Sequence, residues 1–150
     1  MFNLQIKYLS FFFGLISVLS FFNIIYSYYL NLYLNLDTYY LTLMISLIIS
    51  VLFYKIKTSE KKSSIFEKIL TVFFGYLLIP LILSIPFYFS IYNLTFLDSY
   101  FESISGFTST GFTIFENIKH IDQSLILWRS TTQWIGGLYF LFSIIFLIDI

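Results

Sequence analysis

Long runs of apolar residues alternate with short polar stretches along the whole chain. The apolar runs cover approximately residues 8–34, 39–54, 65–91 and 125–148. About 20 apolar residues are enough for a helix to cross the hydrocarbon core of a bilayer. We therefore expect an all-α membrane protein with four transmembrane helices, the third kinked by Pro80 and Pro86 because proline removes a backbone hydrogen bond.

The polar stretches predict how the chain is oriented. A tight turn at residues 35–38 is expected to join the first two helices. Residues 55–64 carry four lysines and one glutamate, and by the positive-inside rule such a basic loop faces the cytoplasm. The N-terminus and the end of the last apolar run then also face the cytoplasm, and residues 92–123 lie outside.

Composition supports the membrane interpretation and excludes several functional classes. Hydrophobic residues make up 59% of the chain and charged residues 11%, against about 25% charged residues in a typical soluble domain. The net charge is zero, so no basic surface exists to attract nucleic acid. The chain has no cysteine and one histidine, and it lacks the common hydrolase and metalloprotease motifs, so an intramembrane enzyme is disfavoured.

The segment between the third and fourth runs does not resemble a simple loop. Thr95 followed by Asp98 is typical of a helix start. Apolar residues then recur at spacings of three and four, at Leu97, Tyr100, Phe101, Ile104 and Phe107, and Gly106 is a natural helix end. This helix of about 10 residues is too short to span a bilayer and too apolar for water. We expect it to enter the membrane and return to the same side.

The residues after this helix are rich in glycine and hydroxyl groups: Gly106, Phe107, Thr108, Ser109, Thr110, Gly111, Phe112 and Thr113. Cation filters use backbone carbonyls and hydroxyl oxygens to replace the hydration shell of the ion. Glycine permits the positive φ angles that such a backbone needs, and a helix C-terminus adds partial negative charge. An ordinary turn can have a similar composition, so these residues alone leave both interpretations open.

Residues 101–111 and 124–137 together favour a filter segment over an ordinary turn. Their sequences, FESISGFTSTG and SLILWRSTTQWIGG, resemble the Trk/Ktr/HKT superfamily of potassium transporters, and most closely its bacterial TrkH-type members. The resemblance implies four non-identical helix–pore-loop–helix repeats around one ion path. Residues 1–54 would be two leading helices, residues 55–64 a cytoplasmic loop, and residues 65–150 the first repeat.

The resemblance also implies which residues contact the ion. Thr108, Ser109, Thr110, Gly111 and Phe112 would form one of four filter segments for K⁺, with Gly111 as the filter glycine. Glycine at this position favours K⁺, whereas serine accompanies Na⁺ transport in plant members. Ser109 and Phe112 depart from the usual Thr-Thr-Gly-small pattern, so a sodium-permeable relative is an alternative.

Five further residues are candidates for structural support of the pore: Glu102, Gly106, Arg129, Gly136 and Gly137. We expect Glu102 to bond backbone groups behind the filter rather than the ion. Arg129 has three candidate carboxylate partners, in Glu102, Asp98 and Glu116, and a salt bridge is preferred over a gating role. The two adjacent glycines are expected to let the last helix approach a neighbouring backbone, although incidental small residues would look the same.

The sequence therefore predicts potassium uptake across the cytoplasmic membrane, with no catalytic residue and no organic cofactor. One filter segment is insufficient for conduction, so we expect either a fragment of a longer chain carrying three more repeats or a self-oligomer. A small membrane accessory or assembly protein is the alternative. The resemblance further implies a homodimer of the full-length protein and a cytoplasmic nucleotide-binding regulatory subunit.

Overall fold

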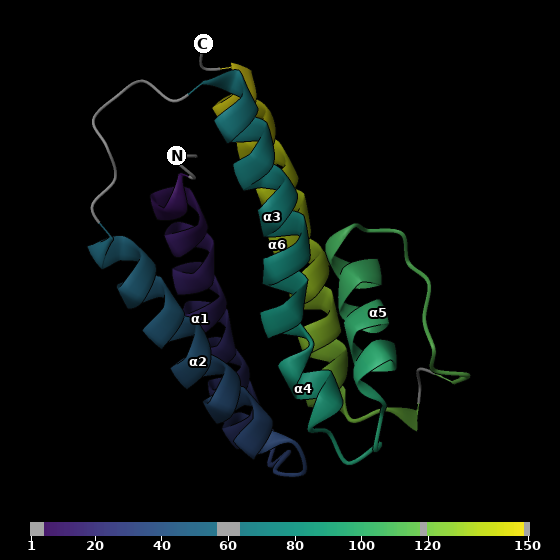
Figure 1. Ribbon diagram of the computed structural model, residues 1–150. Coiled ribbons are helices and arrows are strands. Elements are labelled where there is room, and N and C mark those ends of the chain that lie inside the picture. Colours follow the sequence, from purple (N-terminus) through teal and green to yellow (C-terminus); the bar gives the residue numbers. More distant parts are fainter. Residues whose placement is uncertain (1–4, 57–63, 118–119, 149–150) are drawn as a thin grey trace.

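The computed structural model describes residues 5–56, 64–117 and 120–148, and its regular elements are helices. In chain order these are α1 (Ile6–Tyr29), α2 (Leu36–Lys55), α3 (Ile65–Leu83), α4 (Ile85–Tyr88), α5 (Phe96–Phe107) and α6 (Gln123–Ile148). Helices α1 and α2 pack as an antiparallel pair, and α3 and α6 form a second pair beside it (Figure 1). The short α5 packs on α3 and α6, on the side away from α1 and α2.

Four segments are long and apolar enough to cross a membrane: Ile6–Tyr29, Leu36–Lys55, Ile65–Tyr88 and Gln123–Ile148. They contain 24, 20, 24 and 26 residues, each with a mean hydropathy of at least 1.6. The four predicted apolar runs are thus confirmed as four helical segments. Most of the basic loop predicted at residues 55–64 lies outside the described part of the chain.

The boundary between the first two helices differs from the prediction. Helix α1 ends at Tyr29, five residues before the apolar run ends, because Asn31 adopts a left-handed conformation with φ of 56°. The N–H of Leu32 then donates to the carbonyl of Ser27 at 2.8 Å, which is the 6→1 bond of a Schellman cap. The turn therefore precedes residues 35–38, and α2 already begins at Leu36.

Asn35 belongs to this turn and is buried. Its side chain does not cap α2 and bonds two distant segments instead. The amide nitrogen donates to Asp122 Oδ2 at 2.9 Å, and the amide oxygen accepts from the backbone N–H of Ile91 at 3.2 Å. One side chain thereby joins the α1–α2 turn to the segments that precede α5 and α6.

The third apolar run forms two helices rather than one kinked helix. Pro80 lies inside α3, which continues past it to Leu83, and the break falls at Ser84 with Pro86 in the first turn of α4. Proline is tolerated in a first turn because the N–H it lacks would have no partner there. At the break, the indole N–H of buried Trp128 donates to the Leu83 carbonyl at 3.0 Å. The tryptophan thus satisfies a backbone group exposed by the interruption.

The centre of the structure is aromatic. Tyr139 on α6 is fully buried, and its ring lies 4.8 Å from that of Phe12, 5.1 Å from that of Tyr76 and 5.4 Å from that of Phe107. Its hydroxyl donates to the Val72 carbonyl at 2.9 Å, so the polar tip has a partner. This cluster links α1, α3, α5 and α6 and fixes the C-terminal end of α5.

Candidate functional site

Helix α5 begins as the sequence predicts, at Thr95. The Thr95 hydroxyl oxygen accepts from the N–H of Asp98 at 3.2 Å and caps the helix. The carboxylate of Asp98 accepts from the Thr95 hydroxyl at 2.6 Å, not from the backbone N–H that a capping box would use. The helix has 12 residues, a length of about 18 Å at 1.5 Å per residue. It starts at the end of the bundle near α4, and the chain returns to that end before α6 begins (Figure 1).

Two hydroxyl groups attach α5 to the backbone of α3. The Tyr100 hydroxyl donates to the Leu77 carbonyl at 3.1 Å, and the Ser103 hydroxyl donates to the Pro80 carbonyl at 2.5 Å. Ser103 is fully buried, so its bond satisfies a hydroxyl that would otherwise be costly to bury. Side-chain-to-backbone bonds of this kind fix the height of α5 along α3.

Glycines allow the other side of α5 to approach α6 closely. A Cβ on Gly136 would lie 1.7 Å from the carbonyl oxygen of Phe107, and a Cβ on Gly106 would lie 2.2 Å from the Thr132 hydroxyl oxygen. A Cβ on Gly137 would have no heavy atom within 4 Å. The expected approach of α6 to a neighbouring backbone therefore occurs at Gly136, where the last turn of α5 touches α6, and not at Gly137.

The 108–112 segment leaves the C-terminal end of α5 and is exposed along its length. Ser109 and Gly111 have positive φ angles of 57° and 80°. The Thr110 N–H donates to the Ser105 carbonyl at 3.1 Å, which folds the segment back onto α5. Among the described residues, no hydrogen bond reaches the carbonyls of Thr108 to Gly111. In the described part of the chain, these four consecutive carbonyl oxygens thus have no hydrogen-bond donor.

Phe112 differs from the four residues before it. Its carbonyl accepts from the Ser105 hydroxyl at 2.6 Å and from Arg129 Nη2 at 3.3 Å. An oxygen held by two protein donors faces the protein rather than an ion path. The side chain of Phe112 is exposed. The geometry thus separates Phe112 from the other residues predicted to line a filter.

An ion pair fixes the chain just beyond this segment. Glu102 on α5 is fully buried, and its carboxylate accepts from Arg129 Nε on α6. The same carboxylate accepts from the Thr113 hydroxyl and from the Ile114 N–H, both at 3.1 Å. Arg129 thus pairs with Glu102 rather than with Asp98 or Glu116, and the pair holds the returning chain against α5 and α6. A buried carboxylate needs such donors, because an unpaired charge is expensive away from water.

A cavity of about 420 Å³ lies beside the C-terminal end of α5. It is lined by Thr108 and Ser109 at one side and by the aromatic rings of Tyr76 and Phe140, with Gly136 and Gly137 on α6. The open space next to Gly137 thus belongs to this cavity. The lining is thus mainly aromatic, completed by Phe107, with the Thr108 and Ser109 residues where the chain leaves α5.

Sequence reasoning missed Ser105 and Thr113 as individual contributors. Ser105 bonds both the Phe112 carbonyl and the Thr110 hydroxyl, and Thr113 bonds Glu102. Ser105 directly precedes the hydroxyl-rich stretch and Thr113 ends it, and composition alone does not show which hydroxyls face inward. The described residues contain no group of three or more His, Cys, Asp or Glu side chains that could hold a metal ion.

Comparison with known families identifies the chain. The family model for TrkH, described as a cation transport protein, matches residues 38–149. The chain belongs to the TrkH family. The matched range contains α5, the 108–112 segment and all of α6. It confirms the resemblance inferred from residues 101–111 and 124–137. The family is described as one of cation transport proteins, and the four apolar helical segments of this chain fit a membrane protein.

Individual relatives agree with this assignment. The chain is 29% identical over 126 residues to an uncharacterized cation transporter of Methanocaldococcus jannaschii, an alignment that covers 83% of this chain and 26% of that protein. It is 39% identical over 56 residues to the Trk system potassium uptake protein TrkH of Escherichia coli K12, covering 37% of this chain and 12% of the relative. It is 41% identical over 46 residues to TrkG of the same organism, covering 31% of this chain and 10% of the relative. The chain thus spans about a quarter or less of these relatives.

Proposed function

We propose that this TrkH-family chain takes part in potassium uptake and that residues 108–111 supply one of four segments of a K⁺ filter. The observation that carries the proposal is the run of four carbonyls that accept no hydrogen bond from the described residues, at the C-terminal end of a short helix. K⁺ filters replace ion hydration with such carbonyls. The names of TrkH and TrkG refer to potassium uptake for those two relatives.

The parts around the segment fit this role. Helix α5 and the returning chain would act as a pore loop, with the Glu102–Arg129 pair and the Gly136 contact as its structural support. Phe112, whose carbonyl has two protein donors, would end the filter rather than coordinate the ion. Gly106 would let the end of α5 lie on Thr132.

A complete filter needs three more segments around the same axis. We propose that they come from further repeats of a longer chain; assembly of four copies of this chain is the alternative. Large apolar side chains of α5, including Phe96, Leu97 and Phe101, are exposed, and neighbouring repeats would cover them. A homodimer of the full-length protein and a cytoplasmic nucleotide-binding subunit complete the assembly that we propose.

The proposed orientation places the N-terminus and residues 55–64 in the cytoplasm and α5 towards the outside of the cytoplasmic membrane. Labelling of single cysteines with a membrane-impermeant maleimide tests it, because the chain has no cysteine of its own. A cysteine at Gln123 should react in intact cells and one at Ser64 only after permeabilisation. The reverse pattern would contradict the orientation.

Growth complementation tests the proposed function. The complete reading frame should restore growth at low K⁺ to a bacterial host that lacks its own potassium uptake systems. Gly111→Asp should abolish this growth, because it places a fixed carboxylate in the carbonyl segment. Gln123→Asp is the matched control, since it adds the same charge at an exposed site in the first turn of α6, where negative charge is tolerated. Unchanged growth with Gly111→Asp, or equal loss with both variants, would refute the filter assignment.

A further inference from the structure

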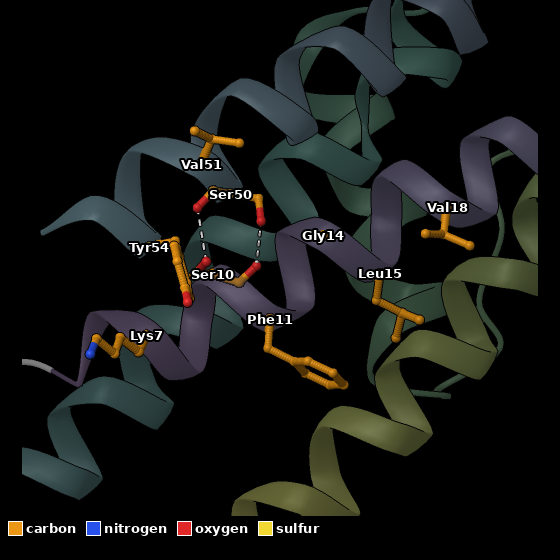
Figure 2. Close-up of a pocket in the computed structure, with 9 residues that line it drawn as sticks. All are labelled: Lys7, Ser10, Phe11, Gly14, Leu15, Val18, Ser50, Val51 and Tyr54. Carbon is orange, nitrogen blue, oxygen red and sulfur yellow. Dashed lines mark hydrogen bonds between the residues drawn. The ribbon is translucent and has the colours of Figure 1, made fainter.

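A second cavity lies far from α5, between α1 and α2. It has a volume of about 600 Å³ and is formed by these two helices alone (Figure 2). The side chains at its rim, Phe11, Val18, Val51 and Tyr54, are exposed. We call it the α1–α2 groove. A groove of this kind on the outside of membrane-spanning helices is open to lipid.

Small residues create the depth of the groove. Gly14 has no side chain, and a Cβ there would lie 3.2 Å from the Ser50 hydroxyl oxygen. The Ser10 hydroxyl donates to the Ser50 carbonyl at 2.8 Å, and the Ser50 hydroxyl donates to the Ser10 carbonyl at 2.9 Å, as the dashed lines in Figure 2 show. Each serine hydroxyl donates to the backbone carbonyl of the other serine, so both hydroxyls on the floor of the groove have an acceptor. The floor therefore suits a hydrocarbon chain.

Charge is confined to one end of the groove. Among the described residues that line it, Lys7 is the charged one and no carboxylate is present. Lys7 lies in the first turn of α1, beside Tyr54 near the end of α2 (Figure 2). Lysine can lay its methylene stem along apolar surface and extend its ammonium group to the headgroup region. The groove is thus apolar along its length and cationic where it meets the membrane surface.

The length of the groove matches one leaflet. From Lys7 to Val18 the helix rises about 16 Å at 1.5 Å per residue, which is close to half of the hydrocarbon thickness of about 30 Å. A phospholipid acyl chain starts at the headgroup and ends near the bilayer centre, so it fits this span. A second protein helix would instead be expected to continue across both leaflets.

We propose that the α1–α2 groove binds one acyl chain of an anionic phospholipid whose phosphate pairs with Lys7. In the orientation proposed above, this lipid belongs to the cytoplasmic leaflet. The site is independent of the 108–112 segment, and its test does not depend on ion transport. The bound lipid would fill the α1–α2 groove and stabilise the packing of the two helices.

Native mass spectrometry of the purified chain tests this proposal with palmitoyl-oleoyl phosphatidylglycerol and the matching phosphatidylcholine as probes. We expect saturable retention of one phosphatidylglycerol per chain, in preference to phosphatidylcholine. Lys7→Gln should lower this retention about fivefold, the factor equivalent to about 1 kcal/mol per lysine at an anionic membrane surface. Lys55→Gln is the charge control, because Lys55 lies at the same end of the helix pair but does not line the groove, and it should change retention little.

A second pair of variants tests the groove itself. Val51→Trp should fill the groove and abolish saturable retention of the lipid, whereas Leu52→Trp places the same bulk on an exposed residue outside the lining. Helical circular dichroism establishes that all variants are folded. Equal retention of the two lipids, equal effects of Lys7→Gln and Lys55→Gln, or lipid retention that survives Val51→Trp would overturn the proposal. So would a dimer of the chain that Val51→Trp dissociates while lipid retention is unchanged.

Discussion

The adjacent glycines on α6 permit a sharp test of how α5 is positioned. A methyl group at Gly136 would lie 1.7 Å from the Phe107 carbonyl oxygen, whereas ordinary van der Waals contact begins near 3.4 Å. The backbones of α5 and α6 would have to separate by about 1.7 Å, the difference between these distances. A methyl group at Gly137 would meet no heavy atom within 4 Å. Gly136→Ala and Gly137→Ala therefore change composition identically but packing differently.

The magnitude follows from two opposing effects. Replacing glycine by alanine inside a helix favours the helix by about 1 kcal/mol, and both variants gain this. Overpacking a well-filled contact costs about 1–3 kcal/mol, and Gly136→Ala alone should bear this cost. The difference in the free energy of unfolding between the two variants, about 1–3 kcal/mol, therefore isolates the contact with Phe107. For a chain of this size, 1 kcal/mol corresponds to about 2–4 °C in Tm.

Thermal unfolding in one detergent, followed by circular dichroism, measures this difference. Gly137→Ala should unfold at or above the temperature of the unsubstituted protein, and Gly136→Ala should unfold several degrees lower than Gly137→Ala. In the complete transporter, Gly136→Ala should also reduce uptake, because it displaces the end of α5 from which the 108–112 segment starts. Equal unfolding temperatures for the two variants would refute the close approach of α5 and α6.

Two other predictions concern buried polar contacts. Arg129→Gln should destabilise the fold by about 3–5 kcal/mol, because it leaves the carboxylate of buried Glu102 without its cation. In a double-mutant cycle with Glu102→Gln, followed by chemical unfolding, the effects of the two substitutions should be non-additive, and additive effects would contradict the pairing. Trp128→Phe should cost about 1–3 kcal/mol by leaving the buried Leu83 carbonyl without its donor, whereas Trp134→Phe, at a side chain that is 67% exposed, should change the unfolding free energy by less than about 0.5 kcal/mol. Equal costs for the two tryptophans would argue against the role assigned to Trp128.

The sequence predicted the number and type of the membrane-spanning elements because about 20 consecutive apolar residues have few other stable arrangements. It also predicted the start of α5 from Thr95, since capping chemistry is local. The end of α1 was misplaced because Asn31 looks like one polar residue in an apolar run. Its left-handed conformation, which ends the helix, depends on the turn that follows.

The details of the candidate site depend on tertiary packing and could not be predicted from the sequence in the same way. The sequence leaves three candidate carboxylate partners for Arg129. The way α5 is rotated against α6 determines that Glu102 is the partner. The same rotation distinguishes Gly136, which touches Phe107, from Gly137, which borders a cavity. The carbonyl of Phe112 accepts from Ser105 and from Arg129, 7 and 17 positions away, and no local sequence pattern encodes these contacts.

Gly111 provides the most direct test of the proposed filter. Its φ of 80° disfavours any side chain, but a Cβ there would have no heavy atom within 4 Å, so Gly111→Ser should alter the conformation of the segment without a steric clash. The decisive measurement is the ratio of ⁸⁶Rb⁺ to ²²Na⁺ uptake by the complete transporter in proteoliposomes, with and without this substitution. The account predicts a preference for ⁸⁶Rb⁺ that falls markedly in Gly111→Ser. An unchanged ratio at unchanged uptake rates would contradict the claim that this segment selects the ion.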